Sequence, residues 1–292
     1  TIDAAVAGSG SGAPAVLLPP SPTTGLQFGY HVVMSADGST LAVSSCVCGV
    51  VYVYEKRDAV WTLVASLSDL KGGATSSDSF GFGLAMSRDG RVIAAGAESQ
   101  TVGGLMQAGR ACVFRKNGSS WSSYSEDASL GVTPATTREN FGSSLALSDD
   151  GKVLVVGADH GFTSSDPGYA YVFRDDAGDG SWTSPVKLGP SNRSTKDEFG
   201  FAVAISPDGT AILVGAPLAP TPMAYFYRYV NSSWGLQAGE TASDARFGSS
   251  VAIAAESGLL YAFVGAEGGQ DQLATFYPGA VHSYEWDPNI GT

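Results

Sequence analysis

One phrase recurs five times along the 292-residue chain, and this repetition constrains the fold more than any other feature. Each copy begins with Phe-Gly and continues through alternating apolar and small residues into a second apolar run. The copies begin at Phe28, Phe80, Phe141, Phe199 and Phe247. A period of this length indicates one supersecondary unit that is repeated and packed against its neighbours. We expect the repeated Phe side chains to anchor each unit to the next.

Each repeat contains short runs of β-branched and aromatic residues bounded by Gly, Asp, Asn and Ser, a pattern typical of strands. In four repeats, a Ser-x-Asp-Gly sequence separates the first two runs, and Asp-Gly supplies the positive φ of a tight hairpin turn. A third run and, after a Trp, a fourth run follow. The pattern predicts an all-β fold: a single β-propeller domain over residues 1–292, with five four-stranded blades.

The fifth repeat lacks a fourth run, and the N-terminal segment resembles the missing piece. Residues 14–21 (PAVLLPPS) are similar to residues 184–191 (SPVKLGPS), which include the fourth run of the third repeat. We therefore expect a strand at about 14–18 to complete the last blade and close the ring. The alternative is that the five repeats are part of a larger ring.

Composition narrows the classes of partner. Only 15% of the residues are charged, and 16 basic residues stand against 28 acidic ones, a net charge of −12. Because nucleic acids and anionic membranes attract basic surfaces, we expect no nucleic-acid partner. No apolar run is long enough to span a bilayer, so we expect no membrane insertion. The chain begins at Thr1 without a basic and apolar leader, and we expect a mature or excised segment.

The phrases FG…S-x-DG…(L/I)AVGA and G-x-(A/V)YVF…W resemble FG-GAP repeats, the blade motif of integrin α-subunit propellers. They are more similar still to the variants in secreted microbial and algal proteins. The resemblance covers nearly the whole chain and implies a propeller at the cell surface or outside the cell. Integrin-type blades often carry a D-x-D-x-D-G calcium loop, whereas Ser-x-Asp-Gly offers too few oxygens for such a site. We expect no cofactor, with a calcium ion as the alternative.

Loops of variable length gather on one face of the predicted propeller, and binding sites concentrate in such loops. The residue after the Gly-Ala signature is acidic in three repeats, namely Glu98, Asp159 and Glu267, and His160 follows Asp159. We expect these acids to converge on one rim. They would bind a cation, bind sugar hydroxyls, act as the acid and base of a glycosidase, or form a plain solvated rim. His31 interrupts a column of small residues and is either a ligand-pocket group or a buried, hydrogen-bonded histidine.

Three N-x-Ser/Thr sequons predict glycosylation at Asn117, Asn192 and Asn231, which favours a secreted glycoprotein. Asn117 and Asn231 fall in hairpins on the face opposite the variable loops.

The three cysteines do not form a zinc-site pattern. We expect Cys112 to be a buried small hydrophobe, and Cys46 and Cys48 to pair or to remain free.

The usual catalytic motifs are missing from the sequence. We therefore expect a non-catalytic, extracellular or cell-surface module for recognition, adhesion or assembly. It would bind a protein or a glycan at the variable loop face, either alone or within a larger protein or assembly. The first alternative is a lectin-like, carbohydrate-binding propeller. The second is a glycoside-active enzyme that uses the acidic rim.

Overall fold

The computed structural model describes residues 16–22, 25–69, 78–159, 166–189, 197–242, 244–270 and 276–286. These residues form strands and turns, as predicted, and the described part of the chain contains no helix. It therefore also contains no apolar helix of membrane-spanning length.

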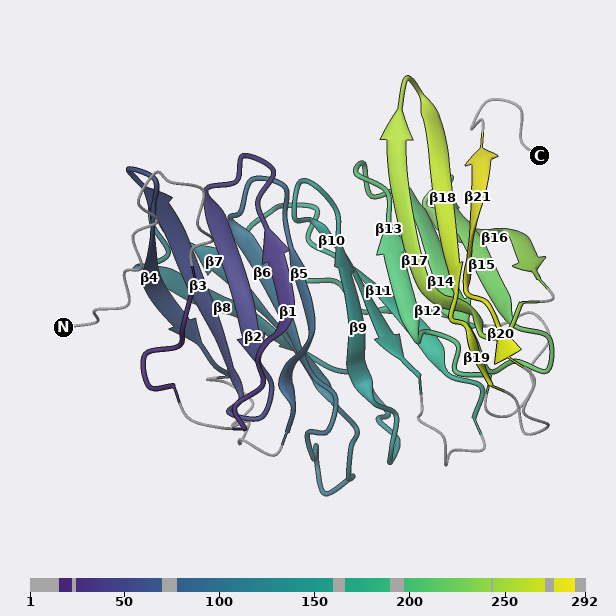
Figure 1. The fold of residues 1–292 in the computed structure, drawn as a ribbon, viewed down its shortest axis with the longest axis horizontal. Helices are drawn as coiled ribbons and strands as arrows, with labels where there is room; N and C mark the ends of the chain where they lie inside the picture. Colours follow the sequence, from purple (N-terminus) through teal and green to yellow (C-terminus); the bar gives the residue numbers. More distant parts are fainter. Residues whose placement is uncertain are drawn as a thin grey trace.

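Five antiparallel sheets follow one another along the chain, one for each repeat (Figure 1). The first two blades contain β1 (Phe28–Met34), β2 (Thr40–Ser45), β3 (Val50–Arg57) and β4 (Val60–Leu67), then β5 (Phe80–Met86), β6 (Val92–Ala97), β7 (Arg110–Lys116) and β8 (Tyr124–Leu130). The third and fourth contain β9 (Phe141–Leu147), β10 (Val153–Ala158), β11 (Tyr169–Arg174) and β12 (Val186–Leu188), then β13 (Ala202–Ile205), β14 (Ala211–Ala216), β15 (Met223–Val230) and β16 (Ser233–Thr241). The fifth contains β17 (Phe247–Glu256), β18 (Leu259–Ala266) and β21 (Ala280–Trp286), while β19 (Gly269–Gln270) pairs separately with β20 (Phe276–Tyr277).

The Ser-x-Asp-Gly turns are held by their own side chains. In the third blade, the hydroxyl of Ser148 donates to Asp150 Oδ1 (2.7 Å), which also accepts from the backbone N–H of Lys152 (3.0 Å). The N–H of Val153 donates to Ser148 Oγ (3.0 Å). The other three turns repeat these bonds. The carboxylates therefore stabilise hairpins, which is the structural role that the sequence predicted.

The blades pack through their Phe-Gly motifs. Phe80, Phe141, Phe199 and Phe247 are fully buried, and each lies in an apolar cluster shared with the preceding blade. The Gly that follows Phe141 has a φ of 98° and a backbone that touches Gly96 of the preceding blade, an approach that leaves no space for a side chain. The predicted blade-to-blade anchors are thus present at four junctions.

The five blades form an arc whose first and last members lie at opposite ends (Figure 1). Contacts between first strands run in series from β1 to β5, β9, β13 and β17. Strand β1 is largely exposed, whereas its equivalent β5 is largely buried by the first blade. The arc in the structure is therefore open.

The predicted completion of the last blade by residues 14–18 differs from what the structure shows. The last sheet has three described strands, and residues 16–18 join no sheet. Instead, Leu17 packs against the first blade, and the hydroxyl of Tyr54 donates to the carbonyl oxygen of Leu18 (2.9 Å). The open arc places the last blade too far away for this contact (Figure 1). Residues 14 and 15 lie outside the described residues.

Candidate functional site

A groove of about 480 Å³ runs along the inner side of the arc and receives side chains from all five blades. Its walls come from the residues just after each Phe-Gly, on the first strands of the blades. The lining includes Tyr30, His31, Phe82, Ser144, Asp159, Phe201 and Ser250. A concave site of this volume, with apolar walls and a few polar groups, is typical of small-ligand or oligomer-segment binding.

Aromatic rings line one part of this groove. The ring of Tyr30 is exposed and lies 5.3 Å from that of Phe82, centroid to centroid. The imidazole of His31 meets the Tyr30 ring edge to face at 4.9 Å. Burial lowers the pKa of His31, so this histidine is neutral at physiological pH. The structure therefore places His31 in the groove, beside an accessible ring that a ligand can stack on.

Three carboxyl groups from different blades influence one another beside the groove. Burial, and then the charge of Asp159, raise the pKa of Glu98 to about 7, against a hydrogen bond with Asn140 that lowers it. Burial and the charge of Asp159 also raise the pKa of Glu198 to about 7, although Arg246 opposes this shift. Near neutral pH these two glutamates exchange protons readily, and each can act as donor or acceptor.

Glu98, Asp159 and Glu198 are named here the carboxyl cluster, and Glu267 is linked to it through Arg246, whose charge lowers the pKa of Glu198. Glu267 is exposed and forms an ion pair with Arg246 (3.0 Å). His160 and Asn192 lie outside the described residues. Asn117 and Asn231 are exposed in hairpins on the opposite face, which leaves both sequons accessible; glycosylation stays a prediction.

Sequence reasoning missed the column directly before each Phe-Gly. All five members have positive φ: Gln27, Ser79, Asn140, Glu198 and Arg246. They face the residues that follow the Gly-Ala signature, as the contact of Asn140 with Glu98 and that of Arg246 with Glu267 show. An alignment extended by one residue toward the N-terminus would have found this polar column.

A second group of ligating side chains is buried away from the groove. Carboxylate oxygens of Asp69 and Glu126 and the sulfur of Cys112 all lie within 4.8 Å of one another. Zinc accepts such a donor set. Burial and the two neighbouring carboxylates raise the pKa of Cys112, so the thiol holds its proton at neutral pH and a cation would have to displace it. Cys46, Cys48 and Cys112 are all free thiols.

Comparison with known proteins supports the repeat assignment. The family model for the FG-GAP repeat matches residues 182–225, which span the end of the third blade and most of the fourth. The chain contains an FG-GAP repeat within a β-propeller fold. No curated protein matches the chain.

Solved structures share the fold of this FG-GAP propeller at low sequence identity. One is Kuenenia stuttgartiensis hydrazine synthase, with a TM-score of 0.58, 13% identity, and coverage of 92% of this chain and 66% of that one. Another is a functionally unknown protein from Desulfotomaculum acetoxidans DSM 771, with a TM-score of 0.55, 14% identity, and coverage of 89% and 72%. The propeller thus spans just under two thirds of the hydrazine synthase chain, and the likeness concerns the fold alone.

Proposed function

We propose that this FG-GAP propeller is a non-catalytic recognition module that binds its ligand in the inner groove. The observation that carries the proposal is a groove to which all five blades contribute residues. Rigid strands position these residues, so the site is preorganised and binding costs little conformational entropy. This mode of action requires no cofactor.

An extracellular or cell-surface location fits the proposal. FG-GAP repeats are typical of extracellular proteins, and residues 182–225 of this chain match such a repeat. The sequons at Asn117 and Asn231 are exposed in hairpins on the face opposite the variable loops. Glycans there would leave the inner groove open. A protein segment in the groove would make the module one for adhesion or assembly.

A glycan is the second candidate ligand, and the combination of rings and carboxyl groups favours it. Sugars present C–H faces that stack on rings such as Tyr30 and Phe82, and hydroxyl groups that bond to carboxyl oxygens. The groups of Glu98 and Glu198, with pKa values of about 7, offer both donors and acceptors to those hydroxyls. The same carboxyl groups would serve an enzyme as acid and base, so hydrolysis must be measured together with binding.

The test compares wild type, Tyr30→Ala and Glu98→Gln on an array of defined glycans and on a panel of purified secreted proteins. Tyr229→Ala is the matched control because its ring packs against Trp234, outside the groove lining. We expect any ligand of the wild type to bind at least tenfold more weakly to Tyr30→Ala and normally to the control. A ligand that binds all variants equally would exclude the groove. Glycan hydrolysis that disappears in Glu98→Gln would show an enzyme instead.

A further inference from the structure

The two ends of the arc expose surfaces that a neighbouring blade covers elsewhere in the arc. Val281 on β21 is 74% exposed, and Phe263 on β18 is 39% exposed. Their equivalents Ala224 and Leu213 in the fourth blade are at most 3% exposed, because the fifth blade covers them. At the other end, Val32 is 55% exposed, whereas the equivalent Leu84 of the second blade is 8% exposed. Half of the twelve exposed large hydrophobic side chains described lie on these end faces: Val16, Leu18, Val32, Met34, Phe263 and Val281.

The exposed ends are the two halves of one junction. At the junction of the second and third blades and at that of the third and fourth, the backbone of the incoming Phe-Gly fits against two glycines of the preceding blade. Gly157 and Gly168 of the third blade touch Gly200 and Phe199 of the fourth in this way. The last blade keeps the same two glycines, Gly265 and Gly279.

At the last blade these glycines line an open surface hollow of about 590 Å³ instead of holding a Phe-Gly. The first blade supplies the opposite half of the junction. Gly29 has a φ of 89°, close to the 95° of Gly200, but no atom of a preceding blade lies within 4 Å of where its Cβ would be. We name the hollow around Gly265 and Gly279 the socket, and strand β1 with its Gly29 the insert. No Phe-Gly occupies the socket, and no preceding blade contacts Gly29 of the insert.

The N-terminal segment belongs to the same half-junction. The hydroxyl of Tyr54 donates to the carbonyl oxygen of Leu18, just as the hydroxyl of Tyr227 donates to that of Gly189 (2.7 Å), beside the fourth strand of the preceding blade. Residues 16–18 therefore lie against the first blade in the position of a preceding blade's outer strand. Their exposed side chains, Val16 and Leu18, are the ones that such a blade would cover.

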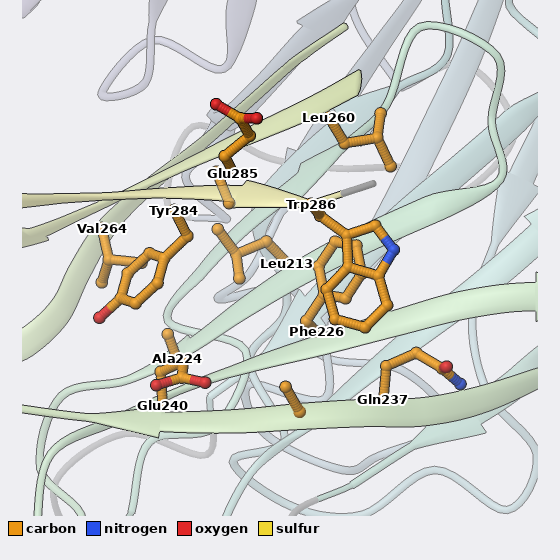
Figure 2. A pocket seen from close by; sticks show the side chains of 12 residues that line it. Leu213, Ala224, Phe226, Gln237, Glu240, Leu260, Val264, Tyr284, Glu285 and Trp286 are labelled. Atoms are coloured by element: carbon orange, nitrogen blue, oxygen red, sulfur yellow. The ribbon is translucent and has the colours of Figure 1, made fainter. Parts of the chain in front are cut away.

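The last blade has room for this segment. Strand β21 has no outer partner strand among the described residues. A groove of about 260 Å³ lies beside it, between the fourth and fifth blades, with Phe226, Tyr284 and Trp286 in its walls (Figure 2). At the junction of the first and second blades, Tyr124 on outer strand β8 and Trp121 in the turn before it pack in the apolar cluster between the blades. A short apolar strand beside β21 would fill the groove and satisfy the open edge.

We propose that these two faces bind each other between copies, so that the first blade of one molecule docks head-to-tail on the last blade of a second. The insert, strand β1 with its Phe28 and Gly29, enters the socket around Gly265 and Gly279, and residues 16–18 pair with β21. One molecule cannot make this contact with itself, because its two faces lie at opposite ends of the arc (Figure 1). A second copy is the smallest partner that carries the matching half. Such a heterologous interface builds a larger ring or a filament.

The mass in solution, measured by sedimentation across a concentration series, tests this proposal. We expect wild type to form complexes of two or more copies. Val281→Asp places a charge on the exposed face of the last blade, and Met34→Asp places one on the exposed face of the first blade. Each substitution should weaken association at least tenfold. Val230→Asp is the matched control, since Val230 is 51% exposed, close to the 58% of Met34, but lies in the β15–β16 hairpin. Circular dichroism verifies that each variant is folded.

A mixture of the Val281→Asp and Met34→Asp variants provides the decisive test of head-to-tail association. Because Val281→Asp keeps an intact first face and Met34→Asp an intact last face, the two monomeric variants should form a one-to-one dimer when combined. Gly265→Ala should weaken association as well, since the added methyl group obstructs the socket. A wild type that is monomeric at every concentration overturns the proposal. A mixture of the two variants that stays monomeric, or variants that associate like wild type, also overturns it.

Discussion

The close approach of neighbouring blades predicts that Gly157→Ala destabilises the protein strongly. A Cβ at Gly157 would overlap the carbonyl oxygen of Gly200 in the next blade and the hydroxyl of Ser144, and would lie 3.1 Å from the Gly200 carbonyl carbon. Since the obstacle is backbone in a strand junction, the third and fourth blades must separate. The hydrogen bond from Ser144 Oγ to that carbonyl oxygen (2.7 Å) would then lengthen or break.

The expected cost follows from these contacts. Overpacking of a tight core costs about 1–3 kcal/mol, and the lost hydrogen bond adds about 1 kcal/mol. Replacing Gly by Ala also restricts the unfolded chain, which offsets about 0.4–1 kcal/mol. We therefore expect the free energy of unfolding to fall by about 1–3.5 kcal/mol.

Urea unfolding, followed by tryptophan fluorescence and far-UV circular dichroism together, measures this change. Gly131→Ala is the control, because no atom lies within 4 Å of its added methyl group, and we expect a change within about 0.5 kcal/mol. Gly265→Ala should also be mild in the monomer, since the methyl group meets the movable hydroxyl of Ser250 instead of backbone. A Gly157→Ala variant as stable as Gly131→Ala would refute the account of how the blades pack.

Three further changes test other parts of the structure. Glu55→Gln should lower the free energy of unfolding by about 2 kcal/mol at pH 7, because buried Glu55 accepts from the Trp121 N–H (2.9 Å) and pairs with Lys116 (3.2 Å). Burial raises the pKa of Glu55, but its hydrogen bonds outweigh burial and hold the pKa at about 2. The difference in free energy of unfolding between wild type and Glu55→Gln should therefore shrink as pH falls from 4.5 toward 2, which acid-unfolding curves measure. Glu98→Gln should gain stability relative to wild type as pH rises from 4.5 to about 7, because the Glu98 carboxyl ionises near pH 4.5 in the unfolded chain but stays protonated to about pH 7 in the folded protein. A difference independent of pH would contradict this. Asp150→Ala should cost about 1–2 kcal/mol in urea unfolding through its lost turn bonds, whereas exposed Asp176→Ala should cost less than half of that.

Local signals predicted the blades well. The Asp-Gly turns and the buried Phe-Gly anchors depend on residues close in sequence, and each of the two features is present four times. The open arc was not predictable, because ring closure depends on the angle between blades and no single residue records that angle. The resemblance of residues 14–21 to residues 184–191 predicted a strand on the last blade, whereas residues 16–18 form no strand and Leu17 packs against the first blade.

The candidate site was predicted in part, for a similar reason. Acidic residues after the Gly-Ala signature pointed to Glu98 and Asp159, which do interact. Glu198 comes from a different loop and faces Asp159 only because adjacent blades bring the two loops together. The buried group of Asp69, Cys112 and Glu126 likewise combines one loop and two strands, β7 and β8, whose spacing in sequence resembles no metal motif.

The titration of the Glu98 carboxyl group, followed by carbon-13 NMR, tests the central claim most directly: that carboxyl groups from separate blades gather beside the inner groove. We expect a midpoint near pH 7 in wild type, and a clearly lower midpoint in Asp159→Asn because the neighbouring negative charge is gone. The spectrum of Glu198 should respond to the same substitution. A Glu98 midpoint near 4.5 that Asp159→Asn leaves unchanged would contradict the cluster and the recognition site built on it.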